Sequence, residues 1–101
     1  MSQAHDPRAL DGYIALQMVN AASAVQQIRM GDLPQYDDNC RRDIGECLLS
    51  IAVTRERQVW IEPTYPVGAP LQIPGLREDD LPGDMTVSEL RRVRRFVCLP
   101  Q

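Results

Sequence analysis

Histidine, serine and cysteine are the first side chains of this chain to test for catalytic chemistry. His5 is the only histidine, and it precedes the first expected helix. A general base must be held within hydrogen-bond reach of its target, and nothing near His5 would hold it there. No serine lies in a nucleophile-elbow sequence, and no cysteine has an evident histidine partner. We therefore expect that the protein is not an enzyme.

The three cysteines, Cys40, Cys47 and Cys98, are an odd number and do not indicate a disulfide framework. Cys40 and Cys47 are two turns apart on one helix, too far to bridge each other or to share a zinc ion. We expect both to be buried as small hydrophobic side chains. Because the sequence also shows no signal peptide and no membrane-spanning apolar run, it predicts a reduced, cytoplasmic protein.

Carboxylates crowd residues 78–84 and are candidate ligands for a hard cation. Their spacing does not reproduce the alternating ligands and closing glutamate of an EF-hand loop. We interpret them as a solvated acidic turn, and we expect no metal and no cofactor. The four residues are Glu78, Asp79, Asp80 and Asp84.

Basic charge is concentrated near the C-terminus, in Arg91, Arg92, Arg94 and Arg95. On a helix these side chains would span a wide arc able to contact a carboxylate-rich protein or phosphates. They would equally complement the negative end of the helix dipole. The whole chain has eleven arginines, no lysine and a net charge of −3, which favours a protein partner over nucleic acid but leaves a local basic stripe open.

The sequence predicts two long helices in the first part of the chain. Apolar positions repeat at helical spacing from Leu10 to Ile28 and from Ile44 to Val59. Between them, Met30-Gly31-Asp32-Leu33-Pro34 is a combination that can end one helix and turn the chain. The sequence therefore predicts an antiparallel helical hairpin.

Capping residues set the expected limits of the two helices. Asp6 offers an N-cap carboxylate and Pro7 suits the first helical position, so we expect a helix over residues 7–30. Tyr36-Asp37-Asp38-Asn39 offers several caps for the second helix, which we expect over residues 38–59.

The remainder of the chain divides into an irregular segment and a short helix. Five prolines between Glu62 and Asp84 exclude a helix or a central strand. This segment is an ordered strap or an extended linker, and its apolar residues favour a strap over 62–84. Val59-Trp60-Ile61 is a candidate short strand at its start. The capping box Thr86-Val87-Ser88-Glu89 predicts a helix over residues 87–96.

The second helix has two apolar sides. Its main stripe contains Ile44, Leu48 and Ile51, whereas Leu49 and Val53 point the other way, and Trp60 would join them if the helix ran that far. The first helix can cover only one side. We therefore expect that the proline-rich segment, the C-terminal element or another chain covers the second side, and that a homodimer does so in a four-helix arrangement.

These expectations combine into one hypothesis about fold and function. We expect a mobile N-terminus over residues 1–6 and a single, mainly α-helical domain over residues 7–101, assembled as a dimeric helical bundle. We expect a small non-enzymatic protein-binding module, acting as an adaptor, an inhibitor or a chaperone-like protein, with no membrane contact. The alternative is a DNA-associated transcriptional regulator that uses the C-terminal arginines. The expected partner-binding residues are Leu49, Val53, Trp60, Arg91, Arg92, Arg94 and Arg95.

Overall fold

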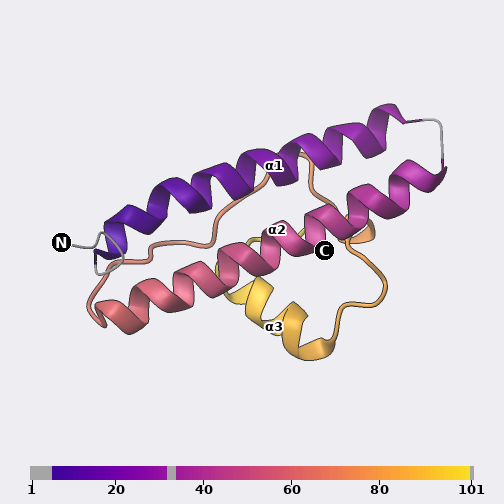
Figure 1. Ribbon diagram of the computed structural model, residues 1–101. Helices are drawn as coiled ribbons and strands as arrows, with labels where there is room; N and C mark the ends of the chain where they lie inside the picture. Colours follow the sequence, from indigo (N-terminus) through magenta and orange to yellow (C-terminus); the bar gives the residue numbers. More distant parts are fainter. Residues whose placement is uncertain (1–5, 32–33, 101) are drawn as a thin grey trace.

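A computed structural model describes residues 6–31 and 34–100 of the chain, with side chains from residue 37 onward in the second stretch. The described part is mainly helical, with α1 over Asp11–Met30, α2 over Pro34–Ile61 and α3 over Val87–Phe96. Single 3-10 turns cover Pro7–Leu10 and Glu78–Asp80. α1 and α2 lie side by side and antiparallel, which confirms the helical hairpin (Figure 1).

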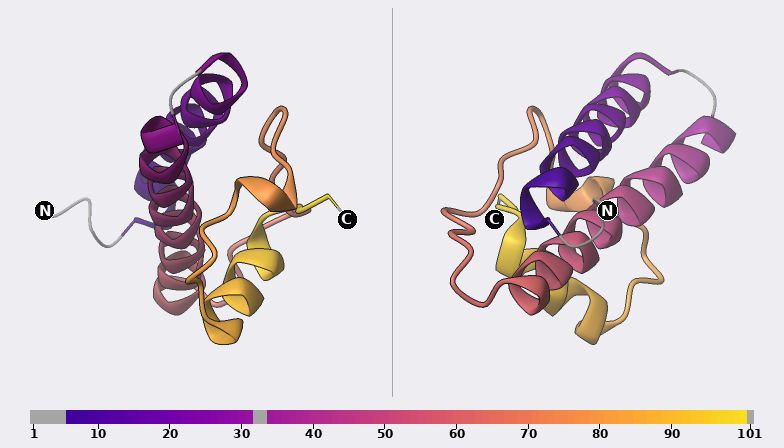
Figure 2. Two further views of the ribbon diagram at one scale, coloured as in Figure 1. Left: turned by 90° about the vertical axis from the view of Figure 1, so that its right-hand side faces the viewer. Right: turned by 60° about the vertical axis from the view of Figure 1, so that its left-hand side comes forward.

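The rest of the described chain packs on one face of the hairpin. Residues 62–86 leave the end of α2, run along both long helices and lead into α3, which lies against α2. Figure 2 shows this segment and α3 on the same side of the hairpin. The other face of α2 is therefore left without a covering element.

The limits of α2 differ from those expected. The helix begins at Pro34, not at residue 38, so Asp37 and Asp38 lie inside it and are not its caps. Proline is favoured in the first turn of a helix, and an acidic residue there complements the dipole. The helix also continues to Ile61, so the short strand suggested at Val59-Trp60-Ile61 is wrong.

The start of the hairpin agrees with its expected cap. The Asp6 carboxylate accepts a hydrogen bond from the Arg8 backbone N–H at 3.0 Å. The first turn after it is a 3-10 turn, and the α-helix proper begins at Asp11. Apart from Asp6, the expected mobile N-terminus lies outside the described residues, as does His5.

The core is aliphatic and draws on every part of the described chain. Alanines on α1 let α2 approach closely, since they carry no side chain beyond Cβ. Three apolar side chains of the proline-rich segment (residues 62–84) enter the same core, and the end of α3 closes it. Its main members are Ile14, Ala21, Ala24, Val25, Ile44, Leu48, Ile51, Ile73, Leu76, Leu81, Val93 and Val97.

A buried ion pair holds the proline-rich segment to α1. Asp80 is 2% exposed, and its carboxylate accepts hydrogen bonds from Arg29 Nη1 at 2.8 Å and Nη2 at 2.7 Å. The Arg77 backbone N–H donates a third bond at 2.8 Å. Burial would raise the pKa of Asp80, but the bonds from Arg29 and Arg77 outweigh it and hold this pKa below its usual value. The interpretation of residues 78–84 as a solvated turn is therefore wrong for Asp80.

A second polar cluster joins α1, α2 and residue 65 at the open end of the hairpin. Gln58 is fully buried, and its Nε2 donates to the Pro7 carbonyl at 2.8 Å and to Asp11 Oδ1 at 2.6 Å. The Tyr65 hydroxyl donates to Asp11 Oδ2 at 2.6 Å. This last bond is the main reason that the pKa of Asp11 is lowered, and it raises the pKa of Tyr65.

The chain leaves α3 in an extended conformation. Leu71 and Val97 form an isolated parallel bridge, with the Leu71 N–H donating to the Phe96 carbonyl at 2.9 Å. The Cys98 N–H returns a bond to the Leu71 carbonyl at 2.7 Å. α3 therefore ends at Phe96, and Val97 directly beyond it is extended. In the described part of the chain, no helix is both long and apolar enough to cross a membrane.

Candidate functional site

A row of side chains along the uncovered side of α2 is the candidate site. At 100° per residue its members fall within an arc of about 80°. Leu49 is half-buried and packs partly on the core, Val53 is 47% exposed and Trp60 is 83% exposed. The other three members are charged and exposed. We call this set the α2 row: Arg42, Glu46, Leu49, Val53, Arg57 and Trp60.

Tyr13 extends this surface onto α1. It lines a shallow hollow together with Leu49, Ser50, Val53 and Thr54. Its side chain is 46% exposed. Tyr13 lies at the edge of the apolar stripe of α1, and packing leaves it exposed. Its aromatic side chain at that edge is the only sequence signal that it could border this hollow.

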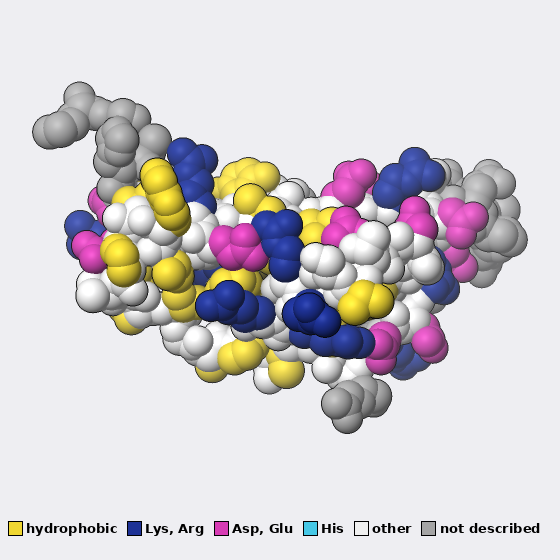
Figure 3. Space-filling model, turned by 90° about the horizontal axis from the view of Figure 1, so that it is seen from below, with side chains coloured by type: hydrophobic (Ala, Val, Ile, Leu, Met, Phe, Trp, Pro, Cys, Tyr) yellow, Lys and Arg dark blue, Asp and Glu magenta, His cyan; other side chains and the backbone are white. Residues whose placement is uncertain are grey.

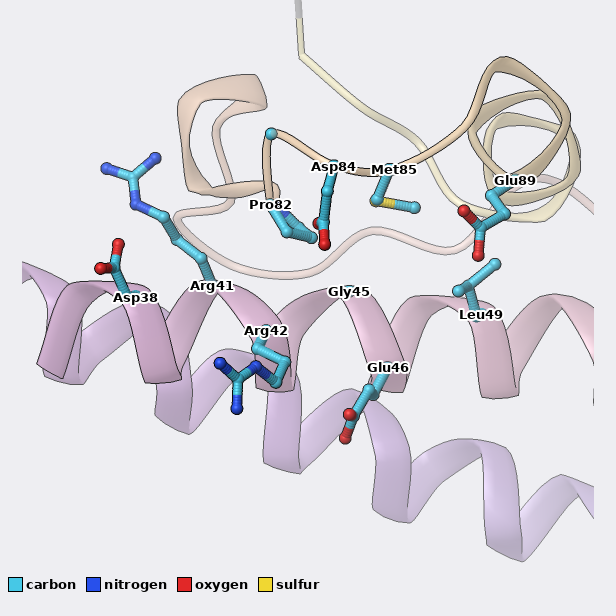
Figure 4. Close-up of a pocket in the computed structure, with 11 residues that line it drawn as sticks. Asp38, Arg41, Arg42, Gly45, Glu46, Leu49, Pro82, Asp84, Met85 and Glu89 are labelled. Carbon is cyan, nitrogen blue, oxygen red and sulfur yellow. The ribbon is translucent and has the colours of Figure 1, made fainter. Parts of the chain in front are cut away.

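On its other side, the α2 row borders a deeper hollow between α2 and residues 82–89. The hollow has a volume of about 500 Å³ and carries charges of both signs. In Figure 4, Leu49 and Glu89 face each other at one end of it. Leu49 lines both hollows, so it lies at the middle of the uncovered surface.

A glycine sets the depth of this second hollow. Gly45 is buried, and a Cβ at this position would lie 2.7 Å from Pro82 Cγ. Any larger residue would push the 82–85 segment away from α2. The absence of a side chain at Gly45 thus lets the Pro82 ring approach α2 closely.

A separate pair of apolar residues lies on the outer side of α1. Leu16 is 54% exposed and Val19 is 65% exposed. Both point away from the side that buries Ile14 and Ala21, so they do not join the α2 row. Sequence reasoning did not single them out, because it followed only the main apolar stripe of α1.

The C-terminal arginines do not form a free basic arc. Arg92 donates to both Glu56 oxygens, from Nε at 2.9 Å and from Nη2 at 2.7 Å, and these bonds lower the pKa of Glu56. Arg94 Nη2 donates to Glu78 Oε1 at 2.8 Å. Figure 3 shows acidic side chains among the basic ones on the face that carries α3.

The remaining two C-terminal arginines, Arg91 and Arg95, differ in their contacts within the chain. The Arg95 guanidinium lies over the Phe96 ring, 5.3 Å from its centroid. Arg91 is exposed and has no ion pair within the described residues. Of the expected partner-binding arginines, Arg91 thus has the fewest internal contacts. None of the four lies on the α2 row.

Two of the three thiols are buried, and Cys98 is exposed. Cys40 and Cys47 are 3% and 8% exposed, as expected for small buried hydrophobic side chains, and burial is the main cause that raises the pKa of each thiol. Across residues 6–31 and 37–100, no three His, Cys, Asp or Glu side chains are grouped closely enough to hold a metal ion.

The geometry thus defines an uncovered surface with an apolar centre and charged ends, flanked by two hollows. Comparisons with protein-family models, with curated proteins and with solved structures gave no match.

Proposed function

We propose that the protein is a small non-enzymatic protein-binding module that acts as a homodimer through the α2 row. The supporting observation is that Val53 and Trp60 remain exposed, at 47% and 83%, although α1 and α3 both pack against α2.

The composition of the surface supports this proposal. Tryptophan and tyrosine bring large apolar area together with a polar handle, and they are enriched among the residues that contribute most to interface affinity. Trp60 and Tyr13 are two of only five aromatic residues in the chain, and both are exposed here. A small domain also has a thin core, so burial of further apolar area in a dimer would stabilise its fold.

The arginine contacts weigh against the DNA-associated alternative. Affinity for duplex DNA depends on arginines and lysines that are free to neutralise phosphates. Arg92 and Arg94 are paired with Glu56 and Glu78 inside the same chain. Binding DNA through them would require breaking these pairs first.

The test of the homodimer compares two identical substitutions on exposed valines. Val53→Glu places a charge in the α2 row, whereas Val19→Glu places it on the outer side of α1. Light scattering over a concentration series should give about twice 11.4 kDa for the wild type and for Val19→Glu. Val53→Glu should give the monomer mass, because a charge would be buried without a partner.

Two results would refute the proposal. One is a wild-type protein that stays monomeric at high micromolar concentration. The other is an equal loss of mass in the two variants, which would show that the position on α2 has no special role. Circular dichroism checks that each variant keeps its helix content. Val53 is preferred to Leu49 for this test because Leu49 also packs on the core.

A further inference from the structure

We infer that the second copy packs its α2 antiparallel to the first, so that Glu46 of one chain meets the partner's Arg57. This inference rests on the proposed homodimer and specifies its geometry. It follows from the order of residues in the α2 row and from which sides of α2 are already occupied.

The spacing of the row fits a seam between two helices. Positions 42, 46, 49, 53 and 60 recur at intervals of three, four or seven residues, as at the contact positions of helices that pack along their length. The row extends over about 27 Å at 1.5 Å per residue. In Figure 4, Arg42 and Glu46 lie on the side of α2 turned away from Met85. Glu89 of α3 borders this line at Leu49, whereas Val53 and Trp60 are exposed and open to the approach of another helix.

The order of residues in the α2 row complements the same row read in the opposite direction. In an antiparallel pair with a two-fold axis at the level of residue 51, on the side of α2 that carries the row, residues at equal distances before and after position 51 face each other across the seam. Glu46 lies five residues before this level and Arg57 six residues after it, so these two are offset by only about 1.5 Å along the seam. Leu49 then faces the partner's Val53, and Arg42 faces the partner's Trp60. The first pair supplies the apolar centre, and the second allows a guanidinium to lie over an indole ring.

The charged residues of the α2 row also favour antiparallel packing of the two α2 helices. On the helical wheel, Glu46 and Arg57 lie on the same flank of the row, the flank nearer α1. A two-fold axis perpendicular to the helices brings equal flanks together, so these residues meet twice, once on each side of the axis. Glu56 lies on the other flank and is held by Arg92 of its own chain.

A parallel pair would not work with the same residues. Arg42, near the middle of the seam, would then lie close to its own copy across a two-fold axis along the helices, and this contact between like charges is unfavourable. The flank that carries Glu46 and Arg57 would lie on opposite sides of the seam in the two copies, so these opposite charges could not meet. The charge order therefore selects the antiparallel arrangement.

The experiment exchanges the charges at the two ends of the inferred pair. In Glu46→Arg homodimers, two arginines face each other at both contacts, and in Arg57→Glu homodimers two glutamates do. Each variant alone should raise the dimer dissociation constant by roughly 30-fold, as expected for two rim pairs turned from attraction to repulsion. An equimolar mixture of the two variants restores both opposite-charge contacts, so heterodimers should form with near wild-type affinity.

Trp60 supplies the readout, because it is the only tryptophan. Its emission should move to shorter wavelength as dimerisation removes it from water. The matched control for Arg57→Glu is Arg77→Glu, which changes the net charge equally at an exposed position of the proline-rich segment, away from the α2 row, and should leave the dissociation constant unchanged.

The outcomes separate this inference from the proposed function. A wild-type dimer whose affinity does not change in either variant, or a mixture that does not recover, would refute the antiparallel geometry while leaving the homodimer in place. A monomeric wild type would refute both. A loss of affinity in Arg77→Glu as large as that in Arg57→Glu would refute the inferred contact, because net charge, and not the pairing of Glu46 with Arg57, would then control association.

Discussion

The substitution Asp80→Asn should show how much the fold depends on one buried ion pair. Asp80 is 2% exposed, and its carboxylate accepts three hydrogen bonds, two from Arg29 and one from the Arg77 backbone. An asparagine keeps one oxygen acceptor but turns an NH2 group toward donors. The charge of Arg29 is then left without its partner.

The expected loss of stability in Asp80→Asn depends on how exposed Asp80 and Arg29 are. Breaking a fully buried ion pair by removing one side costs about 3–5 kcal/mol. The Arg29 side chain is 34% exposed, so water can recover part of its solvation. We therefore expect the free energy of unfolding to fall by about 2–3 kcal/mol at neutral pH. That is a large part of the stability of a small domain.

The pH dependence gives this prediction a definite sign. The folded protein holds the pKa of Asp80 below its usual value. Its contribution to stability is therefore complete above the ordinary aspartate pKa and is lost as the pH falls through the folded value. The difference in unfolding free energy between the wild type and Asp80→Asn should accordingly narrow in acid.

Urea unfolding followed by circular dichroism measures these differences. Asp79→Asn is the control, because Asp79 is exposed and only its backbone carbonyl is bonded, to Arg41. It should cost less than about 0.5 kcal/mol. A cost as small as this for Asp80→Asn, or a cost that is the same in acid and at neutral pH, would contradict the ion-pair explanation.

The other predictions test local structure. Gly45→Ala should destabilise the protein in urea unfolding although alanine favours helix, because its Cβ would meet Pro82 at 2.7 Å. Gly12→Ala, with nothing within 4 Å of the added atom, should stabilise it by about 0.5 kcal/mol, and equal effects at the two glycines would contradict this reasoning. Thr86→Ala removes the hydroxyl that accepts from the Glu89 N–H at 3.0 Å and should cost about 1 kcal/mol; no change in the urea midpoint would argue against the cap.

The elements that sequence reasoning identified are those specified by neighbouring residues. The capping box of Thr86 and Glu89 lies directly ahead of α3, which begins at Val87. The helical hairpin follows from apolar spacing that repeats within single turns. The start of α2 was misplaced because two acidic residues resembled caps, while Pro34 itself suits the first turn.

The sequence also indicated part of the candidate surface. Leu49, Val53 and Trp60 do lie along one side of α2, because helical geometry alone places them there. The pattern could not show that α3 and the proline-rich segment both pack on another side. It also gave little warning of Tyr13, whose exposure depends on the angle at which α1 meets α2.

Local patterns in the sequence determined the helical hairpin and α3 near the C-terminus of the chain, since caps, prolines and apolar periodicity act within a few residues. Tertiary structure decided which charges are engaged and which apolar side chains stay uncovered. Asp80 pairs with Arg29, which is 51 residues away in the sequence, and Glu56 pairs with Arg92, which is 36 residues away. Such contacts arise only when separate elements pack together, and they leave Val53 and Trp60 exposed on α2 while Arg92 and Arg94 of α3 are paired within the chain.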